Sequence, residues 1–214
     1  MKKLKSFILK TSLFLNPLFL INFSFANDFR DNKGNPSFFF AVEAKDVERI
    51  ENLIALGFDV NERDDRGQTP LHYASRYGIL NKVVKALLKA GAEVNATDKN
   101  GYTPLHITSL YGSDNLDVMK TLLEAKAEVN VKDNKGNTPL YWAVVFQRID
   151  KVKVLLEFGA DPSIKNKNEG TPYDIDIIRF AERVGRDIAV LLKKAEEIRN
   201  QNKCRETFGS VIIS

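Results

Sequence analysis

Two short motifs recur along this chain at a nearly constant interval, and this recurrence constrains the fold more than any other feature. Thr-Pro-Leu-His begins at Thr69 and again at Thr103, returns as Thr-Pro-Leu-Tyr at Thr138, and decays to Thr-Pro-Tyr-Asp at Thr171. The starts are 34, 35 and 33 residues apart. Such a period is typical of repeat proteins, whose units bury too little surface to be stable alone and therefore stack.

A second motif keeps the same interval. It is a five-residue motif, Gly-Ala-Glu-Val-Asn in its second copy. The four copies occupy residues 57–61, 91–95, 126–130 and 159–163. A polar turn that ends in glycine precedes each Thr-Pro, at Gly67, Gly101, Gly136 and Gly170. Two motifs that stay in register over several copies are much stronger evidence for a repeat protein than a single motif match, which could arise by chance.

These residues resemble the ankyrin repeat, a family with a period near 33 residues and a Thr-Pro-Leu-His-x-Ala signature. The resemblance covers about residues 35–200. It implies an all-α solenoid of stacked helix–turn–helix repeats with β-turn or hairpin fingertips. We expect about three full repeats between an N-terminal and a C-terminal capping repeat, with units near 37–66, 67–100, 101–135, 136–168 and 169–200.

The residue types at the repeated positions predict where the helices begin and end. A threonine hydroxyl caps the free N–H groups of a helix, and proline fits the first turn because no N–H is needed there. A second helix is expected at 82–90, with Val83, Val84, Leu87 and Leu88 as its apolar stripe. Gly91 and Gly159 are expected to end their helices in the left-handed conformation, whereas Lys126 at the equivalent place predicts a weaker end.

Other helix ends and both caps follow from the same comparison of copies. Gly78 and Gly112 are expected to end first helices, with the inserted residues nearby at 79–82 and 113–115. The N-terminal cap keeps a second-helix stripe of Val47, Ile50, Leu53 and Ile54. In the C-terminal cap we expect a helix over 188–198 with one apolar face, formed by Ile188, Leu191, Leu192, Ala195 and Ile198.

The N-terminus has the layout of a secretory signal peptide. A basic stretch over Met1–Lys5 precedes a mostly apolar stretch over Leu13–Phe25, and Ser24 and Ala26 place small residues at −3 and −1 of a cut before Asn27. We therefore expect residues 1–26 to be a signal, 27–36 a linker and 201–214 a C-terminal tail. The protein is then exported, either periplasmic or secreted, and the bias toward Lys, Asn, Ile and Phe favours a bacterial source.

An uncleaved membrane anchor is the alternative reading of the same segment. A spanning helix needs about 20 consecutive apolar residues. Here the run is interrupted by Lys10, Asn16, Pro17 and Asn22, and proline breaks a helix that has no neighbours. A cleaved signal is therefore favoured, with no membrane span left in the mature chain.

Charge and cysteine content narrow the possible partners. The chain has a formal net charge of +4, and the four lysines of residues 1–26 account for the whole excess. A neutral body lacks the broad basic field that attracts nucleic-acid phosphates, so we expect no nucleic-acid partner. A single cysteine, Cys204, excludes an intrachain disulfide and a cysteine-based zinc cluster.

The sequence offers no constellation that would carry catalysis. His72 and His106 occupy matching positions, but Tyr141 stands there in the third copy, which disfavours a zinc site. In the family this position hydrogen-bonds local backbone. No phosphate-binding loop or Gly-x-Ser-x-Gly elbow is found. We therefore predict a protein that is not an enzyme and uses no cofactor and no metal.

The resemblance implies two binding surfaces, the turns and the exposed side of the first helices. Carried over position by position, it gives an aromatic column of Tyr77, Tyr111 and Phe146. Tyr102 and Leu110 extend this apolar centre, and the polar rim consists of Arg66, Arg76 and Lys135. Interface hot spots have this composition. The alternative is that the column packs against neighbouring repeats, while Tyr73, Ile107 and Trp142 are expected in the core.

The resulting prediction is a monomeric, exported module that binds another protein. We expect Tyr111 to carry much of the binding. The alternative function is a dedicated inhibitor or protective subunit of a partner enzyme in the bacterial envelope, and the sequence does not identify the partner. A scaffold of this kind supports many functions, so the fold alone does not choose between them.

Overall fold

The structure is a computed structural model that describes residues 38–77, 81–111, 116–166 and 177–211. The chain divides into two compact units, residues 1–59 and 60–214. The predicted signal and linker lie outside the described residues, as do Gly78, Gly112 and most of the predicted insertions. All regular secondary structure in the described ranges is helical.

The described part of the first unit is a pair of helices, α3 (Phe38–Glu43) and α4 (Val47–Ala55), which pack against each other. Asp46 precedes α4 and accepts a hydrogen bond from the Arg49 N–H at 3.0 Å, which satisfies a free donor at the helix start. Ile50 and Leu53 of the predicted stripe are buried, whereas Val47 and Ile54 are partly exposed.

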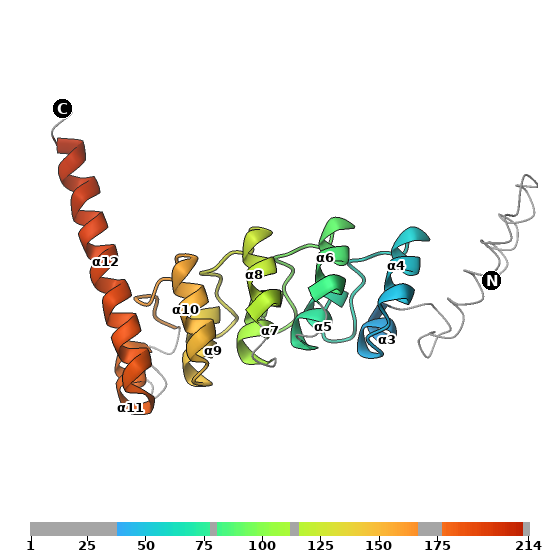
Figure 1. Cartoon of the computed structure of the whole chain (residues 1–214), viewed down its shortest axis with the longest axis horizontal. Coiled ribbons are helices and arrows are strands. Elements are labelled where there is room, and N and C mark those ends of the chain that lie inside the picture. The colour runs from blue at the N-terminus through green and yellow to red at the C-terminus, as the bar shows by residue number, and fades with distance from the viewer. Residues whose placement is uncertain (1–37, 78–80, 112–115, 167–176, 212–214) are drawn as a thin grey trace, which may run out of the picture. The chain divides into compact units, whose positions relative to one another are not determined.

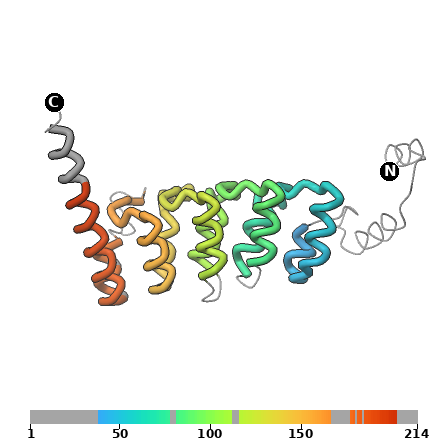
Figure 2. Tube along the Cα trace, turned by 45° about the horizontal axis from the view of Figure 1, so that its top comes forward, coloured from blue at the N-terminus to red at the C-terminus, as the bar shows by residue number. Residues whose placement is uncertain are grey.

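The second unit contains helices in two rows. The first row consists of α5 (Pro70–Tyr77), α7 (Pro104–Leu110), α9 (Pro139–Val145) and α11 (Ile177–Val184). The second consists of α6 (Asn81–Lys89), α8 (Leu116–Glu124), α10 (Ile149–Glu157) and α12 (Arg186–Val211). Each helix contacts the next one of its own row, so the repeats follow one another as stacked pairs (Figures 1 and 2).

The first helices begin where the motif predicts. Thr103 precedes α7, and its hydroxyl oxygen accepts a hydrogen bond from the His106 N–H, while Pro104 is the first helical residue. Thr138 caps α9 through the Tyr141 N–H in the same way. The prediction is confirmed, and its cause is local because each cap needs only residues within one helical turn.

The ends of the second helices show why glycine recurs there. Gly91 and Gly159 have φ angles of +93° and +86°, a left-handed conformation that only glycine adopts without steric cost. Lys126 occupies the same position with φ of +68°. A side chain in this conformation costs roughly 1–2 kcal/mol. The backbone of Lys126 is therefore strained, which is the physical basis of the weaker helix end predicted there.

The core lies between the two rows of helices. Its largest fully buried side chains include Leu71, Leu87, Leu105, Met119, Leu122, Leu140 and Leu155. They come from the first-helix motif and the second-helix stripe, in agreement with the 3.6-residue period expected for helices with one buried face. Leu88 and Leu156, which the stripe also contains, are partly exposed.

The last helix is longer than predicted. It continues to Val211, through most of the segment expected to be a tail. Ile188 and Leu192 are buried, but Ile198, which shares their predicted apolar face, is 49% exposed. With a rise of about 1.5 Å per residue, Ile198 lies about 18 Å along α12, whereas α10 has only nine residues to cover it.

Candidate functional site

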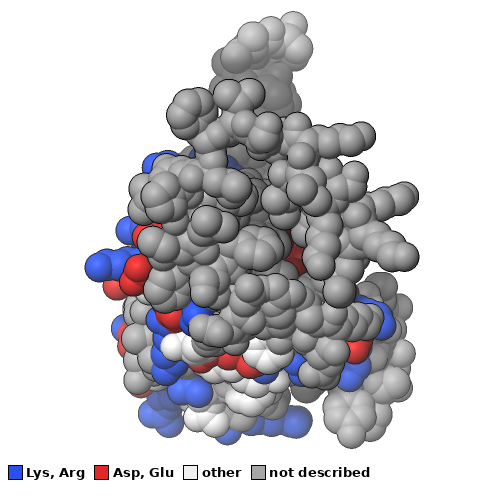
Figure 3. Space-filling view, turned by 90° about the vertical axis from the view of Figure 1, so that its right-hand side faces the viewer, with Lys and Arg blue, Asp and Glu red and all other residues white. Residues whose placement is uncertain are grey.

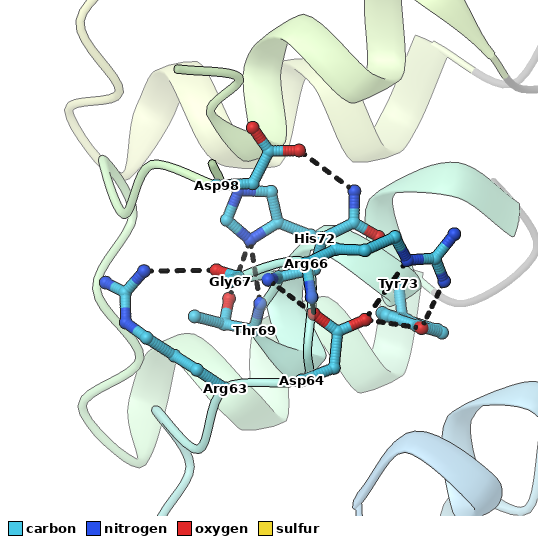
Figure 4. A network of polar contacts seen from close by, with 9 residues as sticks. Arg63, Asp64, Arg66, Gly67, Thr69, His72, Tyr73 and Asp98 are labelled. Atoms are coloured by element: carbon cyan, nitrogen blue, oxygen red, sulfur yellow. Dashed lines mark hydrogen bonds and ion pairs between the residues drawn. The ribbon is translucent and has the colours of Figure 1, made fainter. Parts of the chain in front are cut away.

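Each turn before a first helix is held by an aspartate. One carboxylate oxygen of Asp64 accepts hydrogen bonds from the N–H groups of Arg66, at 2.9 Å, and Gln68, at 2.8 Å (Figure 4). Asp98 and Asp133 repeat this pattern in the next two turns. The turns are thus fixed by side-chain acceptors in addition to their own backbone hydrogen bonds.

The second oxygen of these aspartates accepts a side-chain donor. The Tyr73 hydroxyl donates to Asp64 at 3.0 Å, and Nε1–H of Trp142 donates to Asp133 at 3.1 Å. Although burial by itself raises the pKa of Asp64, hydrogen bonds from backbone N–H groups and from the Tyr73 hydroxyl hold it below its usual value. Turn and first helix therefore form one hydrogen-bonded unit.

The two histidines join each first helix to the turn of the next repeat. Nδ1 of His106 accepts the Thr103 N–H at 3.1 Å, and Nε2 lies 3.1 Å from the carbonyl oxygen of Asn137. Because Nδ1 is an acceptor here, the proton is on Nε2, which donates to that carbonyl. His72 makes the same contact with Thr69 (Figure 4), and its Nε2 lies 2.9 Å from the carbonyl oxygen of Tyr102 in the next turn.

These contacts decide what the histidines can do. Burial lowers the pKa of both His72 and His106, so both rings are neutral near pH 7. Both ring nitrogens of each are engaged with the protein, as the family resemblance implies. Within the described ranges, no group of three or more His, Cys, Asp or Glu residues is placed to hold a metal ion.

Consecutive turns are also hydrogen-bonded to one another through their backbones. The Lys99 N–H donates to the carbonyl of Arg66, and the Asn134 N–H donates to the carbonyl of Asn100, both at 3.0 Å. Gly101 has a φ of +79°, and a Cβ atom there would lie 2.7 Å from the backbone nitrogen of Asn134. Glycine is therefore required both for conformation and for the close approach of the next turn.

A further set of contacts links the loops that follow the second helices. The side-chain amide oxygen of Asn61 accepts the Glu93 N–H at 2.8 Å, and its amide nitrogen donates to the Gly91 carbonyl at 3.2 Å. Asn95 and Asn130 each accept the equivalent N–H of the next loop. This explains why asparagine ends the first three copies of the second sequence motif.

The predicted aromatic column lies on the first helices, and its members differ in exposure. Tyr111 and Phe146 are each 47% exposed, whereas Tyr77, Tyr102 and Leu110 are partly buried. Burial raises the pKa of Tyr102 to about 12, with the nearby Asp133 and Asp98 adding to the effect, so its hydroxyl remains protonated at neutral pH.

Trp142 belongs with this group rather than with the core. Its ring stacks on Phe146 with centroids 6.2 Å apart and meets Tyr102 edge-on at 6.0 Å. Tyr73 and Ile107 at the equivalent positions are buried as predicted, but Trp142 is partly exposed, so that prediction is wrong for the third repeat. Its indole N–H donates to Asp133 of the turn, so the polar atom of this large ring has a partner at the boundary.

We call this set the aromatic surface: Tyr77, Tyr102, Leu110, Tyr111, Trp142 and Phe146. Arg76 adds a cation to it, because its guanidinium lies 4.7 Å from the centroid of the Tyr111 ring. Lys151 lies behind this surface and binds the backbone near Tyr111. This lysine is only 3% exposed, and its Nζ donates to the carbonyl oxygens of Thr108, at 2.7 Å, and Tyr111, at 2.8 Å.

Lys151 was not singled out in the sequence, although a signal is present. In the second helix of the third repeat it stands at the position that the buried Val83 and Val118 occupy in the other two repeats. Free carbonyls at a helix C-terminus attract cations. The ammonium group thus fixes the end of α7, from which the exposed Tyr111 projects.

Comparison with known proteins agrees with this geometry. The family model described as ankyrin repeats (3 copies) matches residues 13–98 and 79–166. The chain is an ankyrin-repeat protein. The first match begins within the predicted signal segment, whereas the described helices begin at Phe38. No curated protein matches the chain.

Ankyrin repeats generally mediate protein–protein interaction, and proteins built from them are typically binding modules without catalytic activity. In this ankyrin-repeat protein the aromatic surface and the turns occupy the two regions through which such binding is expected. No helix in the described part of the chain is long and apolar enough to cross a bilayer.

Of the predicted rim residues, Arg66 and Lys135 are exposed and Arg76 is partly buried. Arg66 is bound to the turn, since its guanidinium contacts Asp64 at 3.4 Å and donates to the Tyr73 hydroxyl at 2.8 Å. Lys135 is exposed at the third turn. On the face shown in Figure 3, positive and negative side chains of the described residues are interspersed, so charge by itself does not single out that face.

Proposed function

We propose that this ankyrin-repeat protein is an exported binding module that holds a partner protein on the aromatic surface. Arg66, Arg76 and Lys135 form the polar rim of the proposed interface. Ankyrin repeats imply a protein partner. The exposed residues of this chain indicate where that partner would bind.

The observation that carries the proposal is the exposure of Tyr111 and Phe146 on neighbouring repeats, each at 47%. A large aromatic side chain buries about 150–250 Å² when fully covered. Covering the exposed half of each ring would therefore contribute about 2 kcal/mol at roughly 25 cal/mol per Å². Two such anchors with a cation beside them have the composition of a binding hot spot.

The test compares capture of partner proteins by residues 27–214 and by the double variant Tyr111→Ala/Phe146→Ala. We expect a partner that binds the first protein and is lost from the second. The matched control is Phe158→Ala, which truncates a ring that is 41% exposed at the end of α10. Circular dichroism establishes that all three proteins are folded. If the double variant still captured the partner, the aromatic surface would not be part of the interface.

Export is a separate part of the proposal, supported by the signal-like pattern of residues 1–26. We expect the protein recovered from the periplasm or medium to begin at Asn27, which its intact mass would reveal. Replacing Ala26 with arginine should block the cut, because the −1 position requires a small residue. Recovery of the uncut chain in the cytoplasm alone would contradict export.

A further inference from the structure

Charge is unevenly distributed over the repeats. The turns and first helices of the three full repeats, residues 63–77, 97–111 and 132–146, contain six Lys and Arg residues but four Asp residues. The body of the chain, residues 27–214, has no formal net charge because the four lysines of residues 1–26 account for the excess of +4. These segments are therefore positive and the remainder of the body is correspondingly negative.

The excess of cationic over acidic side chains in these segments is larger among their exposed residues than among all of their residues. Asp98 and Asp133 are buried, and Asp64 accepts hydrogen bonds from its own turn. Only Asp65 among these aspartates is exposed. The helices α5, α7 and α9 contain no acidic residue. Two of the turn cations are already paired, Arg66 with Asp64 at 3.4 Å and Arg63 with the exposed Glu93 at 3.6 Å. The carboxylates of a partner would therefore meet chiefly Lys99 and Lys135.

We call the exposed cations of the three turns the basic strip: Arg63, Arg66, Lys99, Lys132 and Lys135. The strip is continuous because backbone hydrogen bonds connect each turn to the next, from Lys99 to Arg66 and from Asn134 to Asn100. It runs beside the aromatic surface, since Tyr102 belongs to the second turn and contacts Trp142 on α9.

The spacing of the strip indicates the shape of a matching ligand. Packed helices lie about 8–10 Å apart, so residues at the same position of consecutive turns repeat at about that distance, while the backbones of neighbouring turns are in hydrogen-bond contact. An extended peptide advances about 3.3 Å per residue. Side chains at every third residue of an extended segment, about 10 Å apart, would therefore meet successive turns.

We infer that the partner presents an extended acidic segment to the basic strip, with Asp or Glu at about every third residue and an apolar side chain for the aromatic surface. This inference rests on the proposed function and specifies the chemistry of the partner. The carboxylates pair with Lys99 and Lys135, whose exposed ammonium groups allow approach from solvent. The apolar anchor covers Tyr111 and Phe146.

A nucleic acid fits these observations less well. Duplex binding depends on a broad field that neutralises many phosphates, whereas residues 27–214 have no formal net charge. The aromatic surface also requires an apolar anchor, which a duplex backbone lacks.

The test is a selection of random peptides on the full chain, followed by measurement of the affinity of the selected peptides. We expect enrichment of Asp and Glu over the unselected library, with a three-residue spacing and an adjacent apolar residue. The variant Lys99→Glu/Lys135→Glu should bind these peptides about tenfold more weakly, because it removes two exposed ion pairs and adds repulsion. Raising the salt concentration should weaken binding to the parent chain.

The matched control is Lys82→Glu/Lys85→Glu, which makes the same change of charge at exposed positions of α6 in the second row. It should keep the affinity within about twofold, since it leaves the strip intact. A selection without excess Asp and Glu, or equal losses in both variants, would overturn the inference.

Two further outcomes separate this inference from the proposed function. Enriched peptides without acidic residues that are lost on Tyr111→Ala/Phe146→Ala would leave the aromatic surface as the binding site and refute the acidic segment. A DNA duplex could instead bind the parent chain as tightly as the selected peptides and fail to bind Lys99→Glu/Lys135→Glu. That result would show that the basic strip binds nucleic acid and would refute the acidic segment. Both probes are measured on the same full-length proteins.

Discussion

Lowering the pH from about 7.5 to about 5.5 should destabilise the repeats through His72 and His106 alone. Burial lowers the pKa of both rings in the folded protein, while the unfolded chain titrates near the ordinary value of 6.5. The unfolded state therefore binds more protons below this pH. Stability is fully present above about pH 6.5 and falls as the pH decreases toward the folded-state pKa.

The magnitude follows from the linkage of protons to unfolding. One proton per histidine changes the free energy of unfolding by at most about 1.36 kcal/mol per pH unit, so two histidines give at most about 2.7 kcal/mol per pH unit. At pH 5.5, one unit below the unfolded pKa, the two together have lost at most about 2.7 kcal/mol. The structural reason is that a proton on Nδ1 would abolish the acceptor for the threonine N–H.

The assay is urea unfolding of the parent chain and of His72→Gln/His106→Gln at several pH values. The double variant should be less stable at pH 7.5 but should lose little further stability down to pH 5.5. Carboxylates do not interfere in this range because they titrate below it. Equal slopes for the two proteins would refute the assignment of the pH dependence to these rings.

Three further changes test other features by chemical unfolding. Gly101→Ala should cost more than Gly91→Ala, which costs roughly 1–2 kcal/mol for backbone strain, because only the first also forces Cβ against the next turn; equal costs would exclude the clash. Lys126→Gly should stabilise by about 0.5–1 kcal/mol by relieving the left-handed lysine, and a lower midpoint would contradict this. Lys151→Met should cost roughly 2–4 kcal/mol by leaving two carbonyls without their donor, and should weaken partner binding through Tyr111; an unchanged midpoint would exclude this role.

The features predicted correctly from the sequence are those with local causes. Thr103 and Thr138 cap helices that begin one residue later, because the hydroxyl, the proline and the capped N–H lie within one turn of each other. Gly91 and Gly159 are left-handed for an equally local reason. The recurrence of these signals then dictates the order of the stacked helices.

The features that could not be predicted depend on what the neighbouring repeat supplies. Trp142 is partly exposed, with its ring against Tyr102 of the preceding turn, whereas Ile107 at the equivalent place is buried. Ile198 is exposed because α10 is shorter than α12. Lys151 is buried because the end of α7 provides carbonyl oxygens. Each depends on contacts between helices that the pattern of one repeat does not contain.

The asparagine contacts between loops have a mechanical consequence. Asn61, Asn95 and Asn130 each reach the next loop, 29–33 residues further along the chain. A stack in which each repeat is bonded only to its neighbours gives way one unit at a time when it is pulled from its ends. Each unit that detaches releases about 34 residues, or roughly 110–120 Å of extended chain at 3.3–3.6 Å per residue. Within residues 60–166, resistance to tension is therefore set by one interface at a time rather than by the sum of all interfaces.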